Sequence, residues 1–451
     1  MKRNRVLAVI AVGMCSLLAG MAQDATEPLS VEAAVALALS RNPELLVALE
    51  EQEELKGKIQ EVRSGAFPQV TFQGSGLRMR DPSILNSSSF DNVPQEFKDA
   101  LVPVASNMFD MGIDVKQPVY NAGKVRTALK LAEESLAGKT AASESVRQQL
   151  TFKVLQAFKN LMLMEADRDI VRETQQQRVK HLEQAKVRFG NGVATEIDVL
   201  RSEVNVANME PELIRAENRV RLARAAINNL IMADLEAPTR IAGSLEYRPW
   251  NAGSLEEIQR RTLDHRPELQ VARRQVQQAK LTASLANAEN KLTVDMEGHY
   301  GYAVRQLQNM FQSDYSRWTL TFNFKLPLFD SGRKAGLIMQ ALARLRASEQ
   351  RLAQLENECR LEVKQAFDDM QSSAKAITAA RLSVQQAERV LTLMQANYQY
   401  GAATTLDVAD SQTSLAEARN SQIGATYQYE MAKARLRLAS GSPILDMEVD
   451  R

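Results

Sequence analysis

The sequence predicts a mainly α-helical protein with a β-barrel part, in which one structural unit occurs twice. Three observations support this prediction: long stretches with helical spacing, four short segments with alternating apolar residues, and a hairpin-tip motif that is present in two copies. Ala, Leu, Gln, Glu and Arg dominate the 451 residues, and only 5% are aromatic. Such a composition favours long helices over compact α/β domains.

The tip motif reads Gly-x-x-Thr-x-x-Asp-Val and lies within residues 189–199 and 398–408. Its glycines are Gly192 and Gly401, its threonines Thr195 and Thr404, and its aspartates Asp198 and Asp407. Glycine ends a helix in the left-handed conformation without steric cost, and threonine caps the next helix with an acidic partner three residues later. Each copy therefore predicts a tight turn between two helices.

The duplication extends far beyond the tips. Asp407 follows Asp198 by 209 residues, and the same offset relates Pro118 to Pro327. Upstream the offset is 224, because Pro43-Glu44-Leu45 matches Pro267-Glu268-Leu269. The first copy therefore carries 15 extra residues between Gly74 and Pro118. We expect a first repeat at 23–232, an equatorial connector at 233–264 and a second repeat at 265–451.

The amino terminus has the pattern of a secretory signal peptide, which we place at residues 1–22. Basic residues precede an apolar run, Val6–Ala19, and small residues follow it. Cys15 raises the alternative of a lipid attachment site, which the Met14 before it disfavours. The net charge of +1 gives no indication of nucleic-acid binding.

Four segments, at about 68–78, 109–119, 292–303 and 315–327, alternate between apolar and polar residues. In the last segment Trp318 and Phe322 lie on one face and Thr321 on the other. Strands of about ten residues with this alternation and terminal aromatics are typical of an outer-membrane barrel, although a soluble sheet shows the same alternation. Between the first two segments we expect a long exposed loop, from Met79 to about Asn107.

Helices are expected between the strand pairs and the tips. Uninterrupted stretches of about 65–70 residues lead to each tip, which corresponds to a rod near 100 Å long. After the first tip one return helix is expected from about Thr195 to Met232. Four strands cannot close a barrel, and open edges cannot face lipid, so several chains must assemble. Two copies would supply eight strands, and three would supply twelve with room for a lumen.

The ordered and duplicated motifs resemble those of the TolC-like outer-membrane efflux proteins over the whole mature chain. Residues Ser30–Leu45, their copy ending at Leu269, and both tips carry this resemblance. It implies a homotrimer with a twelve-stranded outer-membrane β-barrel continued by a long periplasmic α-helical barrel. It also implies an exit duct of a tripartite efflux pump or type I secretion system. The partners would be a periplasmic adaptor, an inner-membrane pump or ABC transporter, and outer-membrane lipid.

The resemblance also implies a gate at the periplasmic end. Asp407 and Asp410 match acidic constriction rings, while Tyr398 and Asp198 match a pair that links the two hairpins. Helix capping explains Asp198 and Asp407 equally well, but it does not explain Asp410, whose counterpart is Arg201. Ala403 replaces an arginine that helps to hold the tip closed in the best-known member of the family.

Adaptor docking is implied for both turns. The residues concerned are Gly192, Val193, Ala194, Thr195, Gly401, Ala402, Ala403 and Thr404. The three histidines do not cluster, and no nucleophile elbow, P-loop or zinc spacing occurs, so we expect no catalytic residue, metal or cofactor. The alternative is an exported coiled-coil structural or adaptor protein of the envelope, which would need no lipid-facing strands.

Overall fold

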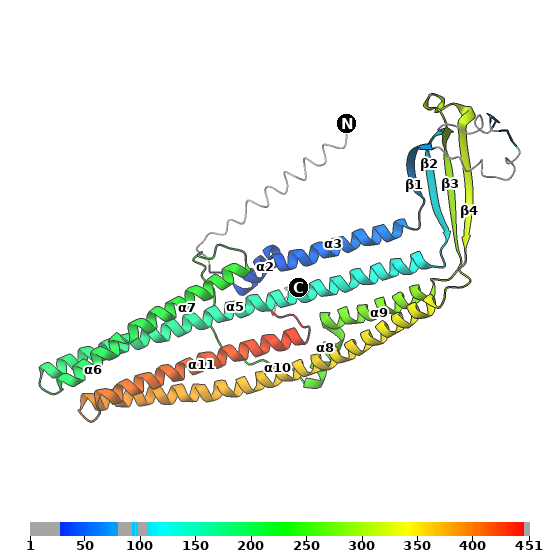
Figure 1. Cartoon of the computed structure of the whole chain (residues 1–451). Coiled ribbons are helices and arrows are strands. Elements are labelled where there is room, and N and C mark those ends of the chain that lie inside the picture. Colours follow the sequence, from blue (N-terminus) through cyan, green and yellow to red (C-terminus); the bar gives the residue numbers. More distant parts are fainter. Residues whose placement is uncertain (1–27, 80–92, 95, 98–105, 446–451) are drawn as a thin grey trace, which may run out of the picture. The chain divides into compact units, whose positions relative to one another are not determined.

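A computed structural model of the chain describes residues 28–79, 93–94, 96–97 and 106–445. The predicted signal peptide with Cys15, and most of the predicted loop after Met79, lie outside these residues. Two units form, each from segments of both sequence copies (Figure 1). Among the described residues, the helical unit comprises 28–50, 141–270 and 353–445, and the sheet unit comprises those within 51–140 and 271–352.

The two copies form the same succession of helices. Those of the first copy are α2 (Val31–Arg41), α3 (Pro43–Ser64), α5 (Lys124–Gly190), α6 (Glu196–Ala207) and α7 (Met209–Leu230). Those of the second copy are α8 (Leu255–His265), α9 (Pro267–Asn287), α10 (Arg333–Gln399) and α11 (Thr405–Ala439). We call α5 with α6 and α7 the first hairpin, and α10 with α11 the second hairpin. Ser30 and Ser254 are side-chain N-caps of α2 and α8, at the equivalent positions of the two copies.

The expectation of one return helix from Thr195 to Met232 is wrong, because α6 ends at Ala207 and α7 begins at Met209. Pro211 explains the break. It has no N–H to donate to the carbonyl of Ala207, and its ring clashes with that carbonyl. The second copy has Asn420 at the equivalent position, and α11 continues without interruption.

The sheet contains four antiparallel strands in chain order. They are β1 (Gln69–Met79), β2 (Ser106–Tyr120), β3 (Thr293–Val304) and β4 (Ser316–Lys325). The strands β2 and β3 come from different copies and pair with Gly112 opposite Gly301. A Cβ on Gly112 would lie 2.6 Å from Cε1 of His299, so this close packing needs glycine.

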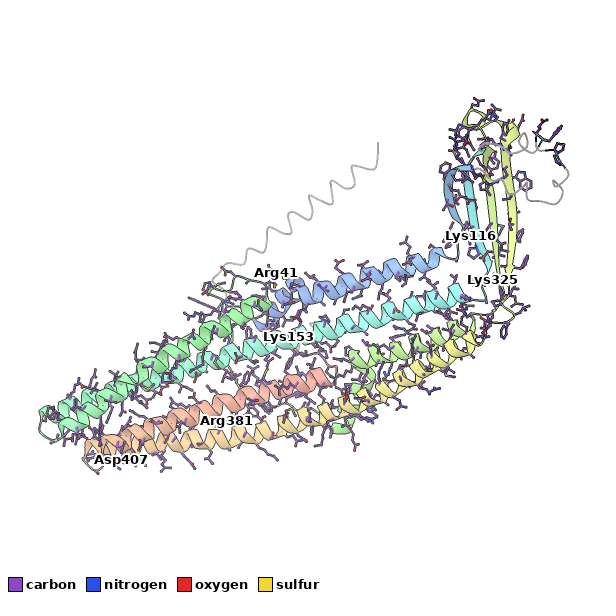
Figure 2. The ribbon with its side chains drawn as sticks, viewed as in Figure 1. Arg41, Lys116, Lys153, Lys325, Arg381 and Asp407 are labelled. Atoms are coloured by element: carbon purple, nitrogen blue, oxygen red, sulfur yellow. The ribbon has the colours of Figure 1, made fainter. Side chains whose placement is uncertain are left out.

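The two faces of the sheet differ in chemistry. Trp318, Leu320, Phe322 and Phe324 of β4 are exposed on one face. The other face carries polar contacts between strands, two of them between β2 and β3 and one that reaches across β3 from β4 to β2. Lys116 binds Glu297 at 3.0 Å, His299 Nδ1 lies 2.7 Å from Asp114, and Arg317 binds Asp110 at 2.8 Å. Figure 2 shows Lys116 and Lys325 on the strands.

Both strand pairs lead into the long helices through the same turn. Two consecutive residues with positive φ, Ala122 and Gly123 in the first copy and Ser331 and Gly332 in the second, reverse the chain. Glu289 then binds the first residue of each long helix, Lys124 at 3.3 Å and Arg333 at 2.9 Å. The turns of the two copies are thus tied to one carboxylate.

The helical unit has a separate apolar core for each hairpin. In the first, Leu150, Phe158 and Leu161 of α5 pack with residues of α2 and α7, including Ile227. In the second, Val363 and Ile377 of α10 pack with Tyr429 and Leu436 of α11. Cys359 of α10 is buried and is a free thiol.

No helix within the described ranges has both the length and the apolar character needed to cross a membrane.

Candidate functional site: the hairpin tips

Both tips end their first helix in the same way. Gly192 and Gly401 have φ of +75°, which only glycine adopts without strain. In the first tip Val193 N donates to the carbonyl of Arg188 at 2.9 Å. In the second tip Ala402 N donates to the carbonyl of Asn397 at 2.8 Å. These bonds are those of the Schellman motif. Val193 and Ala402 are exposed in the turns, and Ala194 and Ala403 are half-buried.

Both tips start their second helix with a capping box. Thr195 Oγ1 accepts from the backbone N of Asp198 at 3.3 Å, and Thr195 N donates to the Asp198 carboxylate at 3.0 Å. Thr404 and Asp407 repeat these bonds at 3.2 and 2.8 Å. The threonine hydroxyl donates to the aspartate at 2.7 Å in both tips and is the main reason why the pKa of each carboxyl is lowered. The predicted caps are therefore present in both copies.

Asp410 is exposed on α11, three residues after Asp407, so the two carboxylates share a face of the helix. Figure 2 shows Asp407 at the end of the second hairpin. The equivalent pair of the first hairpin is Asp198 with Arg201, whose positive charge helps to lower the pKa of Asp198. The second tip therefore has an acidic character that the first tip lacks.

Tyr398 and Asp198 both approach Thr405, the first residue of α11. The hydroxyl oxygens of Tyr398 and Thr405 lie 3.4 Å apart, and a hydrogen bond from Thr405 also lowers the pKa of Asp198. Tyr398 is only 5% exposed, and its ring centroid lies 4.9 Å from that of His181 on α5. The predicted pair is thus placed around one hydroxyl at the junction of the two hairpins.

Arg188 joins the tips directly. Its Nη1 donates to the carbonyl of Gln399 at 3.0 Å, and its guanidinium carbon lies 4.8 Å from the centre of the Tyr398 ring. Gln399 is the last residue of α10, where unpaired carbonyls attract a cation. The second tip has Ala403 in place of an arginine, and Arg188 of the first hairpin brings a positive charge to this tip instead.

Two further arginines connect the hairpins below the tips. Arg178 of α5 donates to Thr413 Oγ1 of α11 at 3.1 Å. Arg419 of α11 binds Glu173 of α5 at 2.8 Å and Glu388 of α10 at 3.0 Å. The contact between the hairpins is consequently polar along this stretch.

The model of the outer membrane efflux protein family matches residues 34–231 and 259–442. The chain belongs to this family. It is similar to the outer membrane protein TolC of Vibrio cholerae, with 22% identity over 90% of this chain and 89% of the relative. It is equally similar to the alkaline protease secretion protein AprF of Pseudomonas aeruginosa, with 22% identity over 90% and 83%.

Solved structures agree with this membership. The crystal structure of the outer membrane protein VceC of Vibrio cholerae has the same fold, with a TM-score of 0.77 and 21% identity, and the match covers 92% of this chain and 97% of VceC. As a member of the efflux protein family, the chain is an outer-membrane channel of an export system with a large periplasmic helical part. The predicted family, location and channel function are confirmed.

A small cavity of about 210 Å³ lies between the hairpins of this efflux protein, beneath the tips. His181, Tyr398 and Gln412 line it together with polar residues such as Lys180. His181 Nε2 and Gln412 Oε1 are buried and have no hydrogen-bond partner among the described residues. Burial lowers the pKa of His181, and the negative charge of Asp198 opposes this effect.

Arg188 and His181 were not predicted as site residues from the sequence. His181 is one of the three histidines that do not cluster in the sequence, and Arg188 precedes the first tip without a motif of its own. The counterparts of Arg188 and His181 at the offset of 209 are Asn397 and Val390. Because most positions of the two copies differ in this stretch, these differences gave no specific signal.

Proposed function

We propose that three copies of this chain close a twelve-stranded β-barrel in the outer membrane, continued by a periplasmic α-helical barrel. The assembly would act as the exit duct of a tripartite efflux or type I secretion machine. It would conduct cargo without chemistry of its own, so no catalytic residue, metal or cofactor is assigned.

One observation carries this proposal: the four-stranded sheet has an aromatic face, a charged face and two free edges in the described chain. An exposed face with Trp318 and Phe322 is suited to lipid, and the ion-paired face with Lys116 and Glu297 is suited to a water-filled lumen. Edges cannot remain open in a membrane, so β1 and β4 must find partners. Three copies supply enough strands for a lumen.

We further propose that the tips form the gate of this duct. Asp407 and Asp410 would form acidic rings at the narrow end, and Tyr398 and Asp198 would hold the hairpins of one chain together through Thr405. Arg188 would assist this closure through the Gln399 carbonyl. The exposed turns containing Val193, Ala194, Ala402 and Ala403 would dock a periplasmic adaptor, through which an inner-membrane pump or ABC transporter delivers cargo.

The test combines mass and conductance. Purified protein in detergent should have the mass of a trimer and should form small, stable channels in planar lipid bilayers. The Arg188→Ala variant should keep the trimer mass and show a higher conductance, because one link between the tips is removed. The control is Arg201→Ala, since Arg201 forms no hydrogen bond or ion pair with the second hairpin among the described residues. A monomer or dimer in detergent would contradict the duct, and unchanged conductance of Arg188→Ala would contradict its part in the gate.

A further inference from the structure

The sheet repeats the internal duplication at the level of single residue pairs. In the first copy Gln73 lies opposite Gly112, and in the second copy Glu297 lies opposite Thr321. Glu297 follows Gln73 by 224 residues and Thr321 follows Gly112 by 209, which are the offsets of the sequence copies. The two strand pairs are therefore equivalent in register, and the contact between the copies, β2 with β3, has a counterpart.

That counterpart would pair β4 with β1, and within one chain these strands are the two edges of the sheet. Asp114 lies opposite His299 where the copies meet. Asn323 follows Asp114 by 209 residues, and His299 follows Ser75 by 224 residues, so Asn323 and Ser75 are the equivalent pair. We propose that β4 of one chain pairs with β1 of the next chain, antiparallel and with Asn323 opposite Ser75. The proposal rests on the proposed trimer and assigns the residues that join its subunits.

The side chains of the two edges fit this register. The observed pair of Ile113 and Tyr300 corresponds, by the same offsets, to Phe322 opposite Gly76. The observed pair of Val115 and Gly298 corresponds to Phe324 opposite Gly74. Phe322 and Phe324 are 51% and 71% exposed in the single chain. A ring that covers a cross-strand glycine compensates for the missing side chain. A shift by one residue would instead turn these rings to the charged face.

The helices provide a second, independent indication. Within the chain, Lys159 of α5 forms a half-buried ion pair with Glu430 of α11 at 3.6 Å. At the offset of 209, Lys159 corresponds to Asp368 of α10 and Glu430 corresponds to Arg221 of α7. The sign of the charge is reversed at both positions, so the two residues still carry opposite charges. The same duplication therefore predicts an ion pair between Asp368 of one chain and Arg221 of the next.

The apolar residues of the same seam are unpartnered in one chain. Met431 of α11 packs against Leu155 of α5 and is 3% exposed, whereas its counterpart Leu222 on α7 is 61% exposed. Arg178 and Thr413 form a hydrogen bond within the chain. Their counterparts in the other copy, which would meet between chains, are Ala387 and Val204. Exposed apolar side chains such as those of Leu222 and Val204 are typical of a permanent subunit interface. The seam fits a second copy of the chain, since both sides come from the same duplicated unit.

Cysteine pairs test the register of the sheet. Directly opposite residues of antiparallel strands have Cα atoms about 4.5–5.5 Å apart, within the disulfide range of about 4.4–6.8 Å. The variant with Ser75→Cys and Asn323→Cys should form covalent dimers and trimers on a non-reducing gel after mild oxidation. The matched control combines Ser75→Cys with Thr321→Cys, which lies about 7 Å further along the strand and should not cross-link. Cys359 is buried and serves as an unreactive background in both variants.

The outcomes separate this proposal from the proposed function. A trimer in detergent that cross-links only in the control pair would overturn the register and leave the duct intact. A ladder that stops at the covalent dimer would support the register and contradict the trimer. A monomer in detergent that forms no cross-link in either variant would overturn both.

Charge exchange tests the helical seam. Arg221→Glu and Asp368→Lys should each lower the temperature at which the trimer dissociates in detergent, because each places like charges across the seam. The double variant restores opposite charges and should recover most of the loss. If the double variant is as unstable as the two single changes combined, Arg221 and Asp368 do not meet.

Discussion

His181 lies at the proposed gate, and histidine is the side chain whose charge ordinarily changes near neutral pH. It lies against Tyr398, borders a cavity with Lys180 and Gln412, and has Arg188 and Asp198 as charged neighbours around the same junction. A buried imidazole with an unpaired nitrogen favours its neutral form. No local sequence pattern predicts such a residue, because its surroundings come from three different helices.

We expect acid to weaken the contact between the hairpins through His181. Its pKa in the folded chain lies below the ordinary value of 6.5, so the unfolded chain binds the proton more readily. The corresponding stability is complete above about pH 6.5 and is lost as the pH falls through the lowered pKa. The temperature at which the helices unfold, followed by circular dichroism, should therefore fall between pH 7.5 and 5.5.

The His181→Gln variant, which does not titrate, should show a smaller fall over the same range. Asp198 and Asp407 titrate below this window, since the pKa of each is lowered from 3.8. Equal pH dependence of both proteins would show that His181 does not couple acid to the hairpin contact.

At the scale of elements, the local sequence patterns predicted the strands and the hairpin turns, which depend on interactions between residues close in the sequence. Alternation of apolar residues placed the strands over nearly the same residues as β1 to β4, and the Gly-x-x-Thr-x-x-Asp motif placed both turns. The break of the return helix was missed because Pro211 was not weighed against the helical spacing around it. The contacts between hairpins could not be predicted, because they join residues such as Arg178 and Thr413, which are 235 positions apart.

The faces of β4 can be tested with neighbouring residues. Arginine at Phe322 would place a charge on the proposed lipid face, at a cost of about 2–4 kcal/mol near the middle of the membrane. An arginine that replaces Thr321 would face the proposed lumen opposite Glu297, where water and the carboxylate would stabilise its positive charge. We expect Phe322→Arg to reduce the amount of heat-stable trimer in the outer membrane and Thr321→Arg to leave it unchanged. Equal amounts from both variants would mean that the faces are assigned wrongly.

At the scale of the whole molecule, one duplicated unit produces two different contacts. Within a chain the hairpins meet through Arg178, Arg188 and Arg419, and the equivalent positions between chains are Ala387, Asn397 and Glu210. Polar contacts with arginine can break and form again in water, because water replaces the lost hydrogen bonds. An opening of the gate should therefore break the contacts of Arg178, Arg188 and Arg419 within one chain, which have no arginine counterparts between chains.

In the proposed trimer, the acidic residues of the second tip would determine which ions pass through the closed duct. With three copies, Asp407 and Asp410 would contribute six carboxylates around one axis. Such a ring concentrates cations and repels anions, because a narrow charged pore focuses the electric field. Hydrogen bonds from Thr404 lower the pKa of Asp407, so capping keeps this carboxyl charged against the repulsion of its neighbours. The channel should be cation-selective at neutral pH and blocked by divalent or trivalent cations from the periplasmic side.

Replacing both residues, Asp407→Asn with Asp410→Asn, should weaken selectivity and block while the trimer stays intact. Asparagine can still accept the capping bond from Thr404, so the tip should keep its turn. The comparison variant is Asp198→Asn, which alters the equivalent cap of the first tip and the contact with Thr405. It should raise the conductance, because the hairpins of one chain are held less firmly, and should leave cation block nearly unchanged. Full selectivity and block in the double variant would show that the two aspartates act only as a cap and a surface charge, and that the constriction lies elsewhere.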